Sequence, residues 1–179
     1  MTSATNSQGY LMHNEQLVLK NGKSVILRSI LPSDGVLIID LFNNISPRSL
    51  YQRFLRNLDA LPEDLLHHFT HINYEKDFAL VSMIKEECKE SIIAVGRYMY
   101  DPHENITDLA LAVRDDWQNL GLGKSLLTRI IAIAREHGIS RFGSMMDTRN
   151  TIMEKILRGL GLEVRYSLRS GFYQVEIIL

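Results

Sequence analysis

One segment limits the fold more than any other: an apolar run, a loop with two glycines, and a long amphipathic helix in succession. Residues 109–113 are apolar at every position, which is typical of a central strand covered on both faces. After the loop at residues 118–123, apolar side chains recur at helical spacing up to Gly138, which ends the pattern. Such a loop gathers unpaired amides at the positive end of a helix dipole. The segment therefore predicts an anion site, although a turn of this kind also occurs for chain geometry alone.

The rest of the chain is mixed α/β and has no internal repeat. The period of the apolar residues is helical in the first third and β-like in the middle. In the first third we expect a strand at 24–28 and then three helices, from Ser33 or Asp34 to Phe42, from Pro47 to Phe54, and from near Pro62. The middle should form a hairpin at 78–83 and 91–98, followed by a turn at 101–105. The last part should contain a strand at 141–146, a helix opened by a capping box at Thr151 and Glu154, and a final strand at 172–179.

Length and composition indicate one compact domain. The chain has 179 residues, 45% hydrophobic and 23% charged, as is ordinary for a globular protein. The polar stretch 1–15 lacks the features of a secretory signal and predicts a disordered tail, with a single domain at 16–179. No apolar run is long enough for a membrane helix, and the lone Cys88 excludes an internal disulfide, so we expect a cytoplasmic protein. A net charge of −1 gives no basic field for nucleic acid.

The glycine loop fits neither of two common phosphate-binding motifs. A P-loop needs Gly-x-x-x-x-Gly-Lys-Ser/Thr, and a Rossmann fingerprint needs three glycines with an acidic residue about 20 positions further on. Instead, Gln118, Gly121 and Gly123 resemble the Gln/Arg-x-x-Gly-x-Gly/Ala signature of the GNAT family of N-acetyltransferases. The stretch 113–118 resembles the protein-lysine acetyltransferase domains of bacteria in particular.

The resemblance extends over nearly the whole chain, since Arg28, Pro32 and Asp34 resemble the family's opening strand and first helix. It implies a GNAT-type α/β fold, with a mixed, mostly antiparallel central sheet, a splayed pair of strands and flanking helices. It also implies acetyl-CoA as cosubstrate and no metal. Asn150 matches an asparagine that contacts the pantetheine arm, although a turn or cap asparagine is the equal alternative. The cofactor-binding positions that it implies are Leu111, Ala112 and Val113 along the arm, Gln118, Asn119, Leu120, Gly121, Leu122, Gly123, Lys124 and Ser125 around the pyrophosphate, and Asn150 and Met153 in the next helix.

The chemistry requires a group that takes a proton, because a lysine amine has a pKa of about 10.4 and attacks a thioester only when neutral. The resemblance points to Asp108, where related protein-lysine acetyltransferases carry a glutamate; a polar strand-entry residue is the alternative. The oxyanion of the tetrahedral intermediate needs a backbone N–H donor on the splayed strand, and the resemblance points to Val113 for it. The tyrosine with which many members protonate the thiolate is replaced by Leu157. Water is one substitute, and the other candidates are Tyr98, Tyr100, Tyr166 and Tyr173.

Side chains of the first third are expected to form the rim that faces the acceptor. They are Arg53, Phe54, His67, His68 and His71. The histidines have no third ligand in view, so we interpret them as a solvated or substrate-contacting face rather than a zinc site. Trp117 is expected to pack in the core, and we assign Cys88 no catalytic role.

Three functions are compatible with the sequence. The first is an N-acetyltransferase that acts on an amine, with a protein lysine as the preferred acceptor, for example on an acyl-CoA synthetase, and a small-molecule amine as the alternative. The second is a non-catalytic acyl-CoA-binding regulatory module, suggested by the shortened Asp108 and by Leu157. The third is a structural domain whose loop is coincidental. A homodimer is compatible with each of them.

Overall fold

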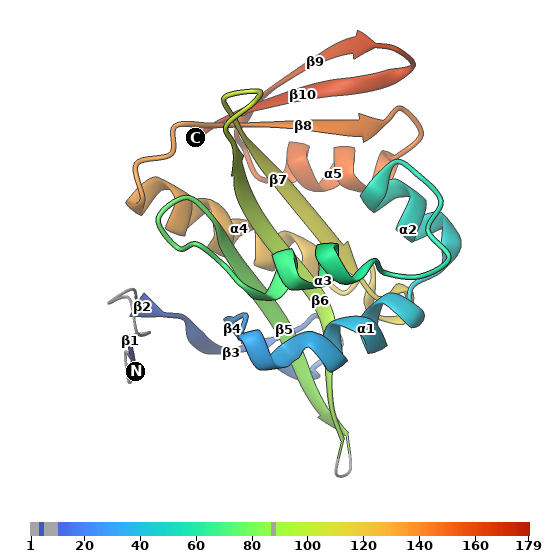
Figure 1. The fold of residues 1–179 in the computed structure, drawn as a ribbon, viewed down its shortest axis with the longest axis vertical. Coiled ribbons are helices and arrows are strands. Elements are labelled where there is room, and N and C mark those ends of the chain that lie inside the picture. Colours follow the sequence, from blue (N-terminus) through green and yellow to red (C-terminus); the bar gives the residue numbers. More distant parts are fainter. Residues whose placement is uncertain (1–3, 6–10, 87–88) are drawn as a thin grey trace.

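The computed structural model describes residues 4–5, 11–86 and 89–179 of the chain. Two antiparallel sheets form its frame, and a short pair, β1 (Ala4–Thr5) with β2 (Leu11–Met12), precedes them (Figure 1). The first sheet has the order β3 (Asn14–Val18), β4 (Ser24–Ser29), β5 (Phe78–Glu86), β6 (Lys89–Asp101) and β7 (Ile106–Val113). The second has the order β8 (Arg141–Asp147), β10 (Phe172–Ile178) and β9 (Glu163–Arg169).

Helices cover both faces of the first sheet. On one face lie the 3-10 turn η1 (Pro32–Asp34) and the helices α1 (Gly35–Asn43), α2 (Pro47–Phe54) and α3 (Glu63–Thr70). On the other face, after the 3-10 turn η2 (Asp115–Trp117), lies α4 (Leu122–Glu136), and α5 (Thr151–Gly159) follows β8 (Figure 1). None of the helices in the described ranges combines the length and the apolar content that a bilayer crossing requires.

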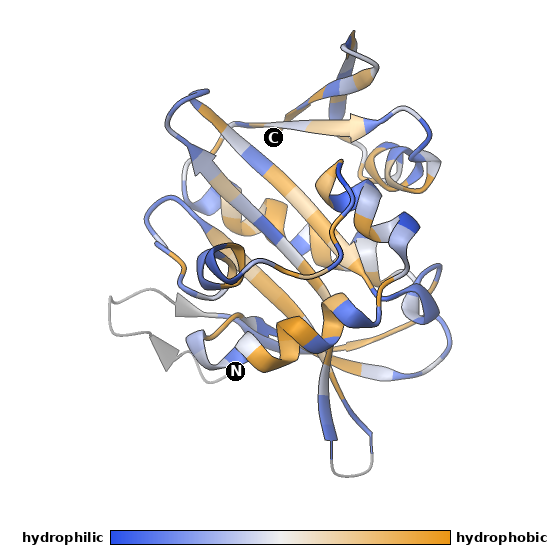
Figure 2. Cartoon of the chain, turned by 45° about the vertical axis from the view of Figure 1, so that its right-hand side comes forward, coloured by the Kyte–Doolittle hydropathy of each residue, from blue (hydrophilic) through white to orange (hydrophobic). Residues whose placement is uncertain are grey.

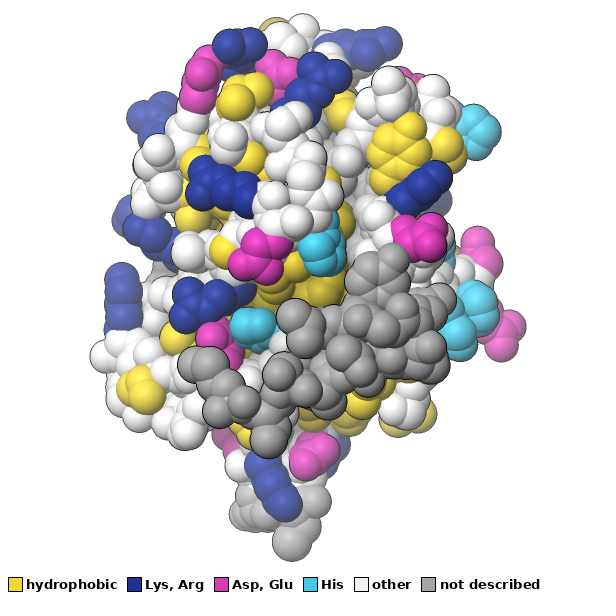
Figure 3. All heavy atoms as spheres, turned by 90° about the vertical axis from the view of Figure 1, so that its left-hand side faces the viewer, with side chains coloured by type: hydrophobic (Ala, Val, Ile, Leu, Met, Phe, Trp, Pro, Cys, Tyr) yellow, Lys and Arg dark blue, Asp and Glu magenta, His cyan; other side chains and the backbone are white. Residues whose placement is uncertain are grey.

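The two faces hold two hydrophobic cores, and the apolar colour of Figure 2 is concentrated along the strands between them. On the surface seen in Figure 3, basic, acidic and histidine side chains are interspersed with apolar ones. The apolar stripe of α4 predicted from the sequence is buried, and it approaches β6 closely: a Cβ atom on Gly96 would lie 3.0 Å from Cγ of Leu126. On the opposite face, Arg28 of β4 donates two hydrogen bonds of 2.7 Å to Asp34, whose carboxylate also accepts from the amide of Leu31. This buried pair fixes the start of the α1–α3 layer.

Strands β7 and β8 separate from each other between the two sheets. The strand pairing of the described chain does not join them, and a side chain makes the link instead: Oγ of Ser144 accepts from the amide of Leu109 at 3.1 Å. The prediction that 109–113 is a central strand was therefore wrong in one respect, since β7 ends its sheet. Of its eight residues only Ala110 is buried and the others are half-buried, because a cavity rather than another strand lies along the free edge.

Other expectations about the elements need correction. The sequence prediction omitted β3 and β9, and the capping box at Thr151 was wrong: Asn150 caps α5, accepting from the amide of Met153 at 3.1 Å. The expected tail at 1–15 extends too far, because Asn14 already pairs with Arg28; its parts at 1–3 and 6–10 lie outside the described residues. Cys88 lies outside them too. Trp117 is buried as expected, with the ammonium of Lys23 over its ring.

Candidate functional site

A cavity of about 330 Å³ fills the gap between β7 and β8. It continues past the start of α4 on one side and the end of α2 on the other, so that Gly123 and Asp108 line the same space. Nine of the fourteen site residues expected from the sequence line it: Asp108, Leu111, Ala112, Val113, Gln118, Asn119, Gly123, Asn150 and Met153. The other five, which are Leu120, Gly121, Leu122, Lys124 and Ser125, do not, and Leu122 is part of the core.

The glycine loop has the backbone geometry of an anion site. Gly121, at φ +88°, precedes the first residue of α4, and no side chain caps the helix. The helical ladder begins with the amide of Ser125, which donates to the carbonyl of Gly121, so the amides of residues 122–124 have no helical partner. A Cβ on Gly123 would lie 3.1 Å from Cδ2 of Leu111, so a side chain at that point crowds the cavity wall. These amides, at the positive end of a four-turn helix, fit a pyrophosphate.

The edge of β7 supplies a second set of backbone groups. Leu109 directs its amide across the gap to Ser144, whereas Arg114 directs its amide to Ile93 on the other side. Because the directions alternate along an antiparallel strand, the amides of Leu111 and Val113 also point into the gap. This edge fits the extended amide-bearing arm of coenzyme A, and the Val113 N–H is one of the amides that point into the gap.

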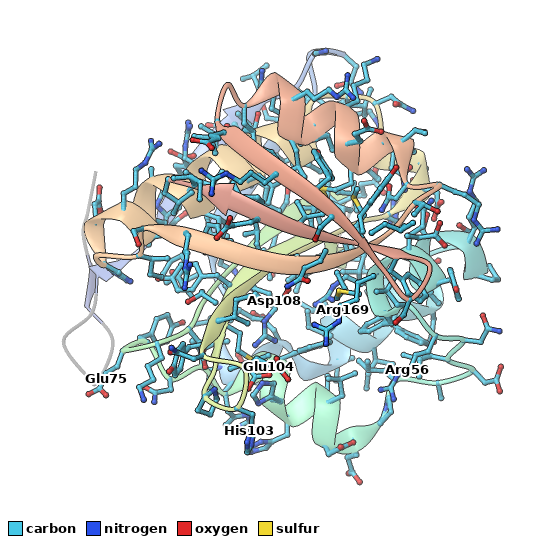
Figure 4. All side chains as sticks on the ribbon, turned by 90° about the horizontal axis from the view of Figure 1, so that it is seen from above. Arg56, Glu75, His103, Glu104, Asp108 and Arg169 are labelled. Atoms are coloured by element: carbon cyan, nitrogen blue, oxygen red, sulfur yellow. The ribbon has the colours of Figure 1, made fainter. Side chains whose placement is uncertain are left out.

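Asp108 lines the cavity near the start of β7, at the other end of the strand from the glycine loop. Its Oδ1 is 2.9 Å from Oγ of Ser144, whose single proton is shared between Asp108 and the carbonyl oxygen of Leu109. Seen from above in Figure 4, Asp108 lies between the β6–β7 turn, which carries His103 and Glu104, and the end of β9 with Arg169. Asp108 is half-buried, so its side chain is accessible in part.

A network of hydrogen bonds joins α2 to the glycine loop, and sequence reasoning missed it. The carboxylate of Asp115 accepts three hydrogen bonds of 2.8 Å, from the amide and hydroxyl of Ser46 and from the hydroxyl of Ser49. Burial alone would raise the pKa of Asp115, but these hydrogen bonds outweigh it and the pKa lies below its ordinary value. The side-chain amide of Gln118 donates to the carbonyl of Val113 at 3.0 Å and to Ser49 at 3.3 Å. Gln118 thus connects the glycine loop to the end of β7 and to α2 by hydrogen bonds of its side chain.

No tyrosine is among the described residues that line the cavity, whereas Leu157 is. The four candidate tyrosines lie outside the lining of this cavity. The hydroxyl of Tyr98 is 2.6 Å from Nδ1 of His137 on the α4 face, and that of Tyr100 donates to Asn105. The rings of Tyr166 and Tyr173 pack edge to face in the second sheet. The structure therefore brings none of them to the expected place of the sulfur.

The expected acceptor rim divides into two parts. Arg53 and Phe54 line the cavity, whereas the three histidines of the rim are exposed on or just after α3 and do not line it. The rings of His67 and His71 stack with centroids 3.9 Å apart. Within the described part of the chain, no group of three or more His, Cys, Asp or Glu side chains is arranged to hold a metal ion.

Comparison with known proteins identifies the family. The model of the acetyltransferase (GNAT) family matches residues 44–161, which include the splayed edge of β7, the glycine loop and α5. The chain belongs to the GNAT family. It is therefore an acetyl-CoA-dependent acetyltransferase.

Named relatives agree with this assignment. The chain is 27% identical over 143 residues to an acetyltransferase of Pseudomonas aeruginosa, covering 80% of this chain and 77% of that one. It is 28% identical over 161 residues to the acetyltransferase Pat of Mycolicibacterium smegmatis, covering 89% of this chain and 47% of Pat, so it spans about half of that relative. The crystal structure of the GNAT domain of S. lividans PAT superposes with a TM-score of 0.84 at 26% identity, covering 93% of this chain and 97% of that domain.

Proposed function

We propose that this GNAT domain transfers the acetyl group of acetyl-CoA to a lysine side chain of a protein, by direct attack of the amine on the thioester. The observation that carries the proposal is the single cavity whose wall includes both the helix-terminal Gly123 and the carboxylate of Asp108. It gives the coenzyme and the amine a common space with a proton acceptor at the amine's end. The protein acceptor is suggested by the similarity to Pat and to the GNAT domain of PAT.

In this mechanism the amides of residues 122–124 bind the pyrophosphate, and the β7 edge at Leu111 and Val113 orients the pantetheine arm. Asn150, whose Oδ1 caps α5, keeps its amide nitrogen free to donate to the same arm. Asp108 accepts the ammonium proton, directly or through one water, and the neutral nitrogen then attacks the carbonyl carbon. The Val113 N–H stabilises the oxyanion of the tetrahedral intermediate, and the nitrogen gives its second proton to water. The intermediate then collapses with cleavage of the C–S bond, and water delivers that proton to the leaving thiolate.

The test uses purified protein, labelled acetyl-CoA and three kinds of acceptor: an acyl-CoA synthetase, lysine-containing peptides, and free amines such as polyamines. We expect label on protein or peptide lysines. Asp108→Asn should lower kcat/KM by roughly 10²- to 10⁴-fold, the usual contribution of a general base, while coenzyme A binds as before. Glu90→Gln, a carboxylate-to-amide change in the distal β5–β6 hairpin, is the matched control and should leave kcat/KM unchanged. Label on free amines alone would refute the protein acceptor.

One observation favours a second candidate, a domain that binds acyl-CoA without catalysis: among the described residues, no tyrosine reaches the cavity and Leu157 occupies the expected place. In that case acetyl-CoA raises the melting temperature, no acceptor is turned over, and Asp108→Asn changes nothing. Loss of turnover in Asp108→Asn with coenzyme binding retained excludes this candidate.

A further inference from the structure

We infer that Arg53 and Arg97 form a binding site for a carboxylate, carried either by the acceptor or by the acyl group, beside the point of acyl transfer. The acceptor version rests on the proposed transferase function, whereas the acyl version depends only on coenzyme binding. Both guanidinium groups lie near the ring of Phe69, with the carbon of the Arg53 guanidinium 5.9 Å and that of Arg97 4.9 Å from the ring centroid, and both side chains line one small cavity. We call this set the arginine pair.

Arg97 is a buried cation without an adequate partner. It points from β6 into the layer of α1–α3, and only 4% of it is exposed. Its Nη2 contacts the sulfur of Met99 at 3.2 Å, which is a weak acceptor, and its buried Nη1 has no hydrogen-bond partner. A buried charged donor that remains unpaired is costly, so an anion that pairs with Nη1 is strongly favoured.

Arg53 places a second cation close to the first. Its guanidinium stacks on Phe54 at 5.0 Å, and within the described chain it forms neither a hydrogen bond nor an ion pair. Burial, together with the nearby charge of Arg53, lowers the pKa of Arg97 to about 10, against the opposing attraction of Asp77 and Asp108. Neither carboxylate forms an ion pair with Arg97: Asp77 accepts from the amide of Tyr100, and Asp108 from Ser144.

The arginine pair lines a small cavity of about 50 Å³ whose other walls are apolar, namely Ile38, Leu41, Phe42, Ile45, Leu50, Phe54, Leu61, Phe69, Val95 and Ala112. Arg53 and Ala112 also line the main cavity, so the two spaces share a wall. The volume is suited to a carboxylate and one or two methylene groups. It also admits a water molecule, whose share of liquid volume is about 30 Å³ and which is the competing occupant.

The register between β6 and β7 places this cavity next to the part of β7 where acyl transfer is expected. Arg97 pairs with Ala110, midway between Asp108, where the amine is expected, and Ala112, where the thioester is expected. Paired residues of antiparallel strands project from the same face, and so do residues two apart. A carboxylate on the arginine pair therefore belongs to a group within a few bonds of the reacting nitrogen or carbonyl carbon, and a planar guanidinium is the side chain best matched to it.

The first experiment tests the acyl version by calorimetric binding, without any turnover. It compares succinyl-CoA with butyryl-CoA, which have acyl chains of equal length and differ in a terminal carboxylate. We expect the wild-type protein to bind succinyl-CoA at least tenfold more tightly, and Arg97→Met to lose that preference while binding coenzyme A unchanged. Arg97→Lys, which keeps the positive charge but loses the planar guanidinium, should keep only part of the preference for succinyl-CoA. If Arg97→Met loses coenzyme A binding, Arg53→Met replaces it.

The second experiment tests the acceptor version by kinetics with acetyl-CoA. The matched acceptors are free lysine against cadaverine, which lacks only the α-carboxylate, and a peptide with Glu against one with Gln next to its lysine. A tenfold higher kcat/KM for the carboxylate member, lost in Arg97→Met, supports this version. Equal values for each pair together with equal binding of the two acyl-CoA compounds overturn the inference and leave the arginine pair hydrated. Turnover without any carboxylate preference leaves the proposed function standing, whereas a succinyl-CoA preference without turnover refutes that function alone.

Discussion

The link between α2 and the glycine loop through Asp115 can be tested by replacing Asp115 with alanine. The change removes three hydrogen bonds of 2.8 Å, to Ser46 and Ser49, and a longer one of 3.5 Å from the side-chain amide of Gln118. Asp115 is exposed, so we assign each bond roughly 0.5–1 kcal/mol, or about 2 kcal/mol in total. In a domain of this size each kcal/mol corresponds to roughly 2–4 °C, so we expect the melting temperature to fall by about 4–8 °C.

The assay is thermal unfolding followed by far-ultraviolet circular dichroism, with Asp116→Ala as the matched control. Asp116 is the next residue and is also exposed, but it pairs only with Arg114, at 2.7 and 2.8 Å, so its loss should cost less than 1 kcal/mol. Because α2 also carries Arg53, Asp115→Ala should raise the KM for the acceptor more than the Kd for coenzyme A. An Asp115 variant as stable as the Asp116 variant would refute the reasoning.

The effect of Asp115 should also depend on pH in a defined direction. Its pKa is below the ordinary 3.8, so the folded state favours the ionised form. The stabilisation is then fully present above the unfolded pKa and is lost as the pH falls through the folded pKa. We expect the difference in melting temperature between wild type and Asp115→Ala to persist from neutral pH to about pH 4 and to shrink in stronger acid. A difference that grows in acid would contradict this assignment.

Three further substitutions test other parts of the molecule. Gly123→Ala should weaken coenzyme A binding at least tenfold in calorimetry, because its Cβ would lie 3.1 Å from Leu111. Gly35→Ala, whose Cβ would have its nearest neighbour at 4.0 Å, should leave the affinity unchanged. Equal affinities of the two variants would place the pyrophosphate elsewhere. Ser144→Ala removes the partner of Asp108 and should lower kcat about tenfold with little change in coenzyme affinity, and an unchanged kcat would remove Ser144 from any positioning role. Arg28→Met leaves the buried Asp34 unpaired and should lower the free energy of unfolding in urea by about 3–5 kcal/mol; a loss under 1 kcal/mol would show that the pair contributes little.

The sequence was sufficient for the parts of the fold that local chemistry specifies. The apolar stripe of residues 122–136, the cap at Ser46 and the proline after it, and the glycine that ends α4 each lie where the pattern placed them. It missed β3 and β9, whose residues are largely polar and which each contact a neighbouring strand on one side only. A strand of that kind resembles a loop until the sheet that it joins is known.

The candidate site divides in the same way. The loop glycines and Asn150 could be predicted from the sequence because turn and cap geometries favour particular residue types. Asp115 could not, since its serine partners lie 66 and 69 positions away and an Asp in a turn has many uses. Arg97 did leave a signal, because a charged residue inside the apolar run 91–98 requires an explanation, but only the structure shows that its neighbour is a second arginine.

The gap between β7 and β8 places the candidate site at the boundary between the two sheets of the molecule. The two sheets are linked there by the hydrogen bond from the Leu109 amide to Ser144, and the other amides of the β7 edge are left for the amide groups of the coenzyme, which take the place of a missing strand. A bound cosubstrate then links the two sheets in addition to supplying the acetyl group, so binding should slow hydrogen exchange along the β7 edge and in the facing strand β8. This additional contact between the two sheets would therefore form when the cosubstrate binds and be lost when coenzyme A leaves, once in each turnover.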